Sequence, residues 1–272
     1  MKKILLACDL NRTVLPDGPA PVSGNAYKYF KKFVEKKDVA FSYMTGMHLS
    51  KSVNAIEKFD VPYPDYLVCD VGTSLYVQRN GNYKNYDEWQ EKFRSEWRKL
   101  DRNFAYKVLS KISYLRIQEK ENQSEFKLSF YFPVIIKRET IDRQVKGVLS
   151  NIDFNFQAVI SYNIIDKVGY LDVLPKSATK GHALEFMQSI FDFKEENIVY
   201  AGDSGNDIEP LTIGYKGIIV NNADKDFKNE VLRVAEEKGL IDKIYLAKGG
   251  YRKMNGNYVA GILEGLEYFG FV

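Results

Sequence analysis

The chain has 272 residues, 45% of them hydrophobic, so it can bury a large core and exceeds the usual size of a single domain. Its 39 basic and 36 acidic residues leave a formal charge of +3, with no arginine-rich arm or basic block. This balance predicts neither a nucleic-acid partner nor a membrane partner.

Two further features of the sequence indicate the cellular compartment of the protein. Met1 and two lysines precede an apolar run that ends at Asp9, too soon for a signal peptide, and no later run reaches the roughly twenty apolar residues of a membrane span. Cys8 and Cys69 both lie in apolar runs, which favours buried free thiols over a disulfide. We therefore expect a cytoplasmic protein.

The first 78 residues alternate between strand-like and helix-like segments. Helical spacing of apolar residues predicts helices at about 23–37 and 50–59. Apolar runs predict strands at 4–8, 39–43 and 65–70. Such alternation is typical of a parallel sheet covered by helices. Turn-forming residues at 80–82 mark the expected end of this first part, so residues 1–78 are assigned to a core domain.

Residues 79–170 have a different pattern, which indicates a small α+β insert. Helical segments rich in charged and aromatic residues are expected over 87–111, and alternating strands at 126–132 and 155–161. The helical spacing of Trp89, Phe93 and Trp97 favours the interior of this insert over a surface that binds sugar.

The core pattern returns over 171–272. We expect a strand at 169–174, a helix at 180–191 and strands near 198 and at 217–220. The fold class is therefore α/β, with a parallel-sheet core in two segments and an insert between them.

Two short polar stretches follow apolar strands in this pattern. The first runs from Cys8 to Thr13 and the second from Gly202 to Asp207. Because ligands bind at the carboxyl ends of the strands in open α/β sheets, we expect the two stretches to meet in one site. Asp9, Asp203 and Asp207 would supply the oxygen ligands that Mg²⁺ prefers. Asp9 is also a candidate nucleophile that forms an aspartyl-phosphate.

Other polar residues are placed to contact a phosphoryl group. Lys180 would add a positive charge beside it, and Thr45 would donate a hydroxyl after the strand at 39–43. Both fit electrostatic stabilisation of a charged transition state. Gly46 and Asn206, from the same two loops as Thr45 and Asp207, are further candidates for phosphate binding.

These motifs resemble, in their order, those of the haloacid dehalogenase superfamily of phosphohydrolases: Asp9 to Thr13, Thr45–Gly46, Lys180–Gly181 and Gly202 to Asp207. Within that superfamily the whole chain is most similar to the sucrose-phosphatase group, also over residues 71–76, 127–131, 171–175 and 260–264.

The resemblance implies a Rossmann-like core with an inserted α+β cap domain, and a Mg²⁺-dependent phosphomonoesterase. It implies that Asp9 is the nucleophile and that Lys180 and Thr45 hold the phosphoryl group. It also implies that the main-chain carbonyl of Asn11 is a metal ligand.

Asn11 departs from the superfamily pattern, in which an aspartate two residues after the nucleophile is the general acid and base. An amide cannot do this work, and such proton transfer typically contributes about a hundred- to ten-thousandfold in rate. Three interpretations remain open: an engineered substitution, a natural variant with altered chemistry, and a natural non-catalytic relative that binds sugar phosphate or regulates.

The resemblance implies a sugar phosphate as substrate, with sucrose 6-phosphate as one candidate among glycosyl and disaccharide phosphates. The candidate sugar contacts lie in segments that resemble the cap and its junction: Lys127, Ser129, Tyr131 and Asp172. Met47 stands where an arginine commonly follows Thr-Gly in the sucrose-phosphatase pattern, a change that touches recognition more than hydrolysis. The sequence predicts no particular protein partner.

Overall fold

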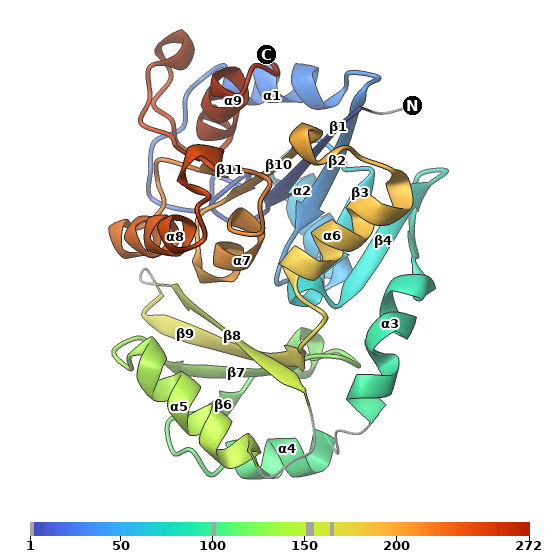
Figure 1. The fold of residues 1–272 in the computed structure, drawn as a ribbon, viewed down its shortest axis with the longest axis vertical. Coiled ribbons are helices and arrows are strands. Elements are labelled where there is room, and N and C mark those ends of the chain that lie inside the picture. The colour runs from blue at the N-terminus through green and yellow to red at the C-terminus, as the bar shows by residue number, and fades with distance from the viewer. Residues whose placement is uncertain (1–2, 99–101, 151–154, 164–165) are drawn as a thin grey trace.

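The computed structural model describes residues 3–98, 102–150, 155–163 and 166–272. These residues form an eight-stranded sheet and a four-stranded sheet, which lie one above the other in Figure 1. Among the described helices, none has both the length and the apolar character that crossing a membrane requires.

The eight-stranded sheet has the order β12-β11-β10-β1-β2-β3-β4-β5. All neighbours from β12 to β3 are parallel, and β4 and β5 add an antiparallel edge. Its strands are β1 (Ile4–Asp9), β2 (Val39–Met44), β3 (Tyr66–Cys69), β4 (Ser74–Arg79), β5 (Asn82–Asn85), β10 (Ile198–Gly202), β11 (Lys216–Ile219) and β12 (Ile244–Leu246).

The central strands are buried on both faces, as expected for continuous apolar runs in a parallel sheet. Cys8 of β1 pairs with Ala201 of β10, and Asp9 pairs with Met44 of β2. This register brings the loops after β1, β2 and β10 to the same edge of the sheet.

Helices cover both faces of this sheet (Figure 1). A side chain on Gly265 of α9 would meet Ile218, whereas one on the adjacent Gly217 would meet Leu211 of α7, so α9 and α7 pack on opposite faces of β11. The helices of this part are α1 (Ala26–Val34), α2 (Leu49–Lys58), α6 (Lys180–Phe191), α7 (Ile208–Leu211), α8 (Lys225–Glu237) and α9 (Val259–Tyr268).

The four-stranded sheet is antiparallel, with the order β6-β7-β9-β8. Its strands are β6 (Arg116–Ile117), β7 (Leu128–Pro133), β8 (Phe156–Asn163) and β9 (Val168–Pro175), and its helices are α4 (Arg102–Leu109) and α5 (Arg138–Leu149). Buried Ile141, Val145 and Leu149 recur at helical spacing along α5, which packs against β8 and α4.

Helix α3 (Asp87–Arg98) runs from the larger sheet toward the smaller one (Figure 1). Its Trp89, Phe93 and Trp97 are buried, which confirms the prediction that they belong to the interior. Trp89 also packs on Phe186 of α6, with ring centroids 5.0 Å apart, so this helix is anchored on the core.

Two sequence-based expectations about these sheets are wrong. The strand expected in the core at 169–174 is β9, which pairs with β7 and β8 in the smaller sheet. The turn at 80–82 does not end the larger sheet, because β5 continues it on the edge beyond β4. Strand patterns alone do not tell which partner a strand pairs with. The division into core and cap remains a prediction, and the sheets favour boundaries after β5 and after β9.

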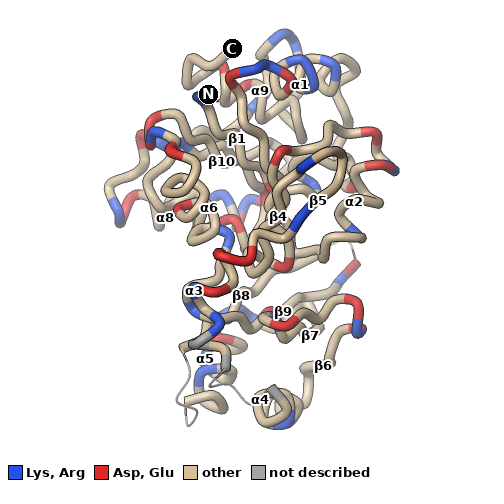
Figure 2. Tube along the Cα trace, turned by 90° about the vertical axis from the view of Figure 1, so that its right-hand side faces the viewer, with Lys and Arg blue, Asp and Glu red and all other residues tan. Residues whose placement is uncertain are grey.

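Basic and acidic residues are interspersed along the chain in both parts (Figure 2). Cys8 and Cys69 are buried free thiols, as predicted.

Candidate active site

Three aspartates meet at the carboxyl edge of the larger sheet, as predicted. Asp9 is the last residue of β1, Asp203 directly follows β10, and Asp207 ends the short turn after it. All three are buried, and each offers a carboxylate oxygen within 4.8 Å of those of the other two.

Lys180 lies between two of these carboxylates. It is the first residue of α6, and its Nζ lies 2.6 Å from Asp9 Oδ1 and 2.8 Å from Asp207 Oδ1. The side chain of Thr179 caps this helix by accepting a hydrogen bond from the main-chain N–H of His182. Burial lowers the pKa of Lys180, but the charges of Asp207 and Asp9 outweigh it, and the pKa is raised overall. The lysine therefore stays positive beside Asp9.

Burial disfavours the ionisation of two of these aspartates, Asp9 and Asp203. Burial raises the pKa of Asp9 to about 7, an effect that Lys180 opposes and Asp207 reinforces. Burial, and then the charges of Asp9 and Asp207, also raise the pKa of Asp203 well above its usual range. A bound cation would favour the ionised form of both groups.

Asp207 already has its hydrogen-bonding capacity occupied. Its Oδ1 accepts from Lys180 and from Tyr200 Oη at 2.6 Å, and its Oδ2 accepts from the main-chain N–H groups of Asp203 and Ser204. A side chain on Gly202 would lie only 2.6 Å from Asp207 Cβ, so the glycine allows this close approach. Asp207 thus holds in place both Lys180 and the loop that begins at Asp203.

Asp203 is different, because one of its oxygens is available. Thr13 donates its hydroxyl to Asp203 Oδ1 at 2.9 Å. The other oxygen, Oδ2, has no hydrogen-bond partner among the described residues, although Arg12 Nε lies 3.5 Å away. A buried carboxylate oxygen in this situation is suited to a metal ion.

The predicted phosphate-binding loop follows β2. Thr45 is fully buried, and its main-chain N–H donates to Val68 O of β3 at 2.8 Å. Its hydroxyl accepts from the main-chain N–H of Met47 at 3.2 Å. Gly46, Met47 and Asn206 line the cavity beside the aspartates.

Asn11 is held by a carboxylate that the sequence analysis did not single out. Its Nδ2 donates to Asp17 Oδ2 at 2.7 Å, and the main-chain N–H of Arg12 donates to Asp17 Oδ1 at 2.6 Å. Arg12 has a positive φ of 57°, and its carbonyl accepts from Asn222 Nδ2 at 2.6 Å. The loop that carries Asn11 is therefore fixed from two sides.

A cavity of about 430 Å³ lies over these residues, within the usual size for a small-molecule site. Asp9, Asn11 and Asp203 line it from the larger sheet, and side chains of the smaller sheet and its loops line the other side. The latter are mostly hydrogen-bonding groups: Gln118, Asn122, Tyr131, Ser161, Tyr162, Asn163 and Tyr170.

Three of the four candidate sugar contacts, Lys127, Tyr131 and Asp172, line this cavity. Tyr131 donates its hydroxyl to Glu119 at 2.6 Å. Ser129 is buried and is not among the lining residues; it donates to Asp172 Oδ1 at 2.5 Å. Burial raises the pKa of Asp172, and the charge of Lys127 opposes this effect.

The comparison with known proteins identifies the family. The sequence profile of sucrose-6F-phosphate phosphohydrolase matches residues 2–270. The chain belongs to this family. The similar proteins reported below are named as phosphatases and hydrolases.

Two relatives of this family member illustrate the similarity. A putative HAD-like hydrolase of Nitrosococcus oceani is 34% identical over 268 residues, which cover 98% of this chain and 72% of the relative. Mannosylfructose-phosphate phosphatase of Agrobacterium fabrum is 25% identical over 228 residues, which cover 80% of this chain and 83% of the relative.

Among solved structures, the sucrose-phosphatase of Synechocystis sp. in complex with sucrose and phosphate has a TM-score of 0.82 and 21% identity, with both chains fully covered. This similarity confirms the predicted α/β fold of the haloacid dehalogenase type.

Several site residues of this family member were missed by sequence reasoning. Tyr200 is a polar side chain inside the apolar strand β10, three residues before Asp203, which was a usable signal. Asp17 lies in the Pro-Asp-Gly stretch 16–18 and carried no signal, because such a sequence is typical of ordinary turns. Gln118 directly follows the short strand β6, and Asn122 ends a single 3-10 turn, Lys120–Asn122; the position of such short segments depends on the folded chain.

Proposed function

We propose that this chain is built as a Mg²⁺-dependent phosphomonoester hydrolase that removes phosphate from a sugar phosphate. The observation that carries the proposal is the cluster of Asp9, Asp203, Asp207 and Lys180, which opens on a cavity lined by hydrogen-bonding groups of a second sheet. The cluster suits phosphate chemistry and the cavity suits a polar leaving group.

The donor set fits Mg²⁺, which prefers oxygen ligands. Asp9, Asp203 and the main-chain carbonyl of Asn11 would hold the ion. Both oxygens of Asp207 already accept hydrogen bonds, so Asp207 would contribute charge and hold Lys180 and the loop in place. The bound ion would neutralise the repulsion between the nucleophile and the phosphate.

The residues of the chain would then act in two steps. A carboxylate oxygen of Asp9 attacks phosphorus, the bond from phosphorus to the sugar oxygen breaks, and an aspartyl-phosphate forms. Lys180, Thr45, Gly46 and Asn206 surround the phosphoryl group and stabilise its charge. Water next attacks phosphorus, which returns Asp9 as a free carboxylate and releases inorganic phosphate.

Both steps need a proton transfer that Asn11 cannot supply. The sugar oxygen must gain a proton in the first step, and the attacking water must lose one in the second. We therefore expect slow turnover by this chain. The alternative is a non-catalytic protein that binds sugar phosphate, and Asn11 is the observation that favours it.

For the substrate, we propose a glycosyl or disaccharide phosphate. The amide and hydroxyl groups of the cavity match a polyol, and two of the similar proteins are named for disaccharides, mannosylfructose phosphate and sucrose. A cytoplasmic location and the absence of nucleic-acid and membrane partners remain predictions.

The decisive test is phosphate release with Mg²⁺ from this chain and from Asn11→Asp. The panel contains sucrose 6-phosphate, mannosylfructose phosphate, monosaccharide phosphates and a non-sugar ester. An aspartate at 11 would face Asp17 Oδ2, an acceptor that now receives the Asn11 amide. The exchanged pair Asn11→Asp with Asp17→Asn restores a donor and an acceptor and belongs in the comparison.

We expect Asn11→Asp to raise the rate about a hundred- to ten-thousandfold, the usual contribution of a general acid and base. Turnover of non-sugar esters alone would contradict the substrate class. No turnover by either aspartate variant, with sugar phosphate still bound, would favour the non-catalytic alternative.

A further inference from the structure

The turn Asp70–Gly72, between β3 and β4, contacts both sides of the predicted phosphate site. The main-chain N–H of Val71 donates to Thr45 O at 3.0 Å, and that of Asp70 donates to Met47 O at 3.0 Å. A side chain on Gly72 would lie 2.2 Å from Thr179 C and 2.5 Å from Lys180 N. The turn is therefore packed between the Thr45 loop and the start of α6.

The backbone of this turn is strained. Asp70 has a φ of 54° and Val71 a φ of 63°, a region that β-branched residues rarely adopt. Such conformations persist only where the surroundings enforce them, and they concentrate at functional sites. Here Trp89 Nε1 donates to Gly72 O at 2.8 Å, and Thr73 Oγ1 donates to Asp70 O at 3.1 Å.

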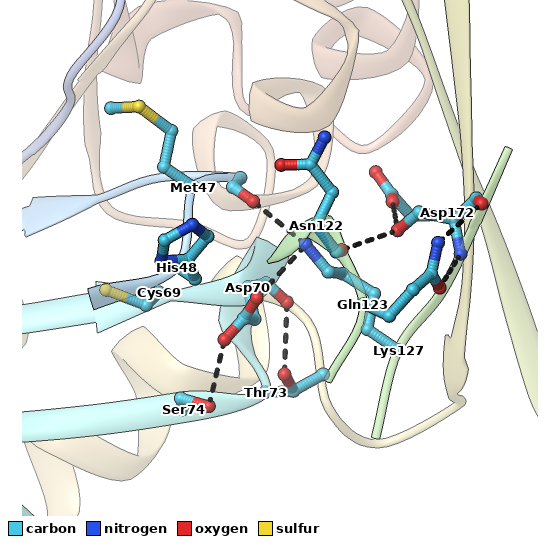
Figure 3. Close-up of polar contacts among 12 residues, drawn as sticks. Met47, His48, Cys69, Asp70, Thr73, Ser74, Asn122, Gln123, Lys127 and Asp172 are labelled. Carbon is cyan, nitrogen blue, oxygen red and sulfur yellow. Dashed lines mark hydrogen bonds and ion pairs between the residues drawn. The ribbon is translucent and has the colours of Figure 1, made fainter. Parts of the chain in front are cut away.

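Lys127 holds the turn from the side of the smaller sheet. It directly precedes β7, yet its Nζ lies 3.0 Å from Asp70 Oδ1 and donates to Gly46 O at 3.1 Å. Figure 3 shows this side chain reaching from its strand to Asp70 and to the loop before Met47. The side chain of Lys127 is 3% exposed and that of Asp70 is 5% exposed. One ammonium group thus connects the second sheet to the phosphate-binding loop and to the strained turn.

A buried ion pair of this kind is poorly explained by stability alone. Desolvation of the two charges offsets much of their attraction, and apolar replacements of such pairs are often neutral or stabilising. The contact with Gly46 O is the informative one, because that carbonyl belongs to the residue after Thr45. The ammonium group of Lys127 is thus already engaged inside the protein, by a hydrogen bond to Gly46 O and by an ion pair with Asp70.

We infer that Lys127 and Asp70 form a positioning unit for phosphate binding. The pair fixes the turn 70–72, and the turn sets the Thr45–Gly46 loop and the backbone at Lys180 at the correct spacing. Lys127 then acts through Gly46 and Asp70, rather than as a sugar contact. This inference rests on the proposed function, since it assigns the Thr45 loop to phosphate.

The test compares Lys127→Met, Asp70→Asn and the double variant with the unchanged chain. Three readouts are used: inorganic phosphate binding with Mg²⁺ by calorimetry, thermal unfolding, and hydrogen exchange of the amides of Thr45, Asp70 and Val71. Arg94→Gln is the control, because it removes a partly exposed ion pair with Glu125 outside the site. Its effect on phosphate affinity is expected to stay below about twofold.

We expect Lys127→Met to weaken phosphate binding about tenfold, within the usual range for coupling between sites, and to speed exchange at the three amides. The single variants leave a buried charge unpaired and should unfold at lower temperature. The double variant removes both charges and should recover thermal stability, while phosphate binding stays weak. Weak phosphate binding in a thermally stable double variant would identify a positioning role, because a merely structural role predicts that phosphate binding recovers together with thermal stability.

Two results would overturn the inference: unchanged phosphate affinity in Lys127→Met, or recovery of affinity together with stability in the double variant. A sugar contact would instead appear, in the Asn11→Asp background, as loss of sugar-phosphate turnover with normal turnover of p-nitrophenyl phosphate. Failure of the proposed function is distinguishable, because the unchanged chain would then bind no phosphate while the exchange changes in Lys127→Met persisted.

Discussion

Tyr200 shows how a single side chain in a buried strand supports the site. Its ring is fully buried in β10, and its hydroxyl donates to Asp207 Oδ1, the same oxygen that accepts from Lys180. A hydrogen bond to a buried carboxylate contributes more than one between neutral groups. Tyr200 therefore stabilises the charge that in turn holds the lysine beside Asp9.

We predict that Tyr200→Phe lowers the free energy of unfolding by about 2 kcal/mol, the usual value for a hydrogen bond to a charged group. Tyr215→Phe is the matched control, because it removes a hydrogen bond of the same length, 2.6 Å, to the neutral amide of Gln188. It should cost about 1 kcal/mol. Urea denaturation of the two variants measures the difference, and equal losses would refute the role assigned to the Asp207 charge.

The raised pKa values of the site aspartates predict how stability depends on pH. Without metal, Asp9 and Asp203 bind protons in the folded state that they release on unfolding, because burial raises their pKa, to about 7 for Asp9. The contribution of Asp9 is therefore fully present below its unfolded pKa of about 4 and is lost as pH rises through 7, and the contribution of Asp203 is lost in the same direction. Metal binding needs the ionised forms, so it should offset this loss.

We accordingly predict that the rise in Tm produced by Mg²⁺ is larger at pH 8 than at pH 5. Thermal unfolding in chelator and in saturating Mg²⁺, at several pH values between these limits, measures it. In Asp203→Asn, the rise in Tm produced by Mg²⁺ should depend less on pH. A Mg²⁺ effect that is independent of pH would contradict a site built from buried carboxylates.

At the level of elements, the sequence predicted what depends on local pattern. Strands β1, β2, β3 and β10 are continuous apolar runs, and the polar loops after β1 and β10 follow directly from them. Because parallel strands end at one edge, the meeting of Asp9 with Asp203 could be foreseen.

The features that the sequence did not predict depend on pairing between segments far apart in the chain, which no local pattern encodes. Strand β9 alternates in burial like other strands, but only its pairing with β7 and β8 assigns it to the smaller sheet. The positive φ angles of Asp70 and Val71 were equally hidden, because neither residue type favours them over other conformations. The cavity between the two sheets depends on the pairing of β9 and on the backbone conformation of this turn.

The turn Asp70–Gly72 yields a prediction of its own. Gly72 has a φ of 116°, and an added Cβ would overlap the backbone of Thr179 and Lys180. We expect Gly72→Ala to destabilise the protein by more than about 3 kcal/mol, since backbone atoms cannot move aside easily. Gly81, with a φ of 81° and no atom within 4 Å of an added Cβ, is the control. Gly81→Ala pays only the conformational cost of about 1 kcal/mol.

Chemical denaturation of the two glycine variants measures both values. Similar losses would mean that φ, and not the contact with α6, determines the need for glycine at 72. Inorganic phosphate binding should fall in Gly72→Ala and stay unchanged in Gly81→Ala.

For the whole molecule, the important fact is that two separate sheets line one cavity. The larger sheet contributes Asp9 and Asp203, and the smaller one contributes Tyr170 and Asp172. A ligand with a phosphate at one end and a sugar at the other would contact both sheets at once. Phosphate alone would engage mainly the first, and free sugar mainly the second.

We therefore predict that a disaccharide phosphate with Mg²⁺ stabilises this chain more than phosphate and free disaccharide supplied together. Linking the two groups means that the second contact forms within one complex, at a high effective concentration. At a hundred times its dissociation constant the ligand adds about 2.7 kcal/mol, or roughly 5 °C in Tm for a chain of this size. The slow turnover expected with Asn11 preserves the ligand during a calorimetric scan, and Asp9→Asn with Asp203→Asn is the control that should lose the phosphate-dependent part. Equal shifts from the linked and the separate ligands would mean that the two sheets do not bind one substrate between them.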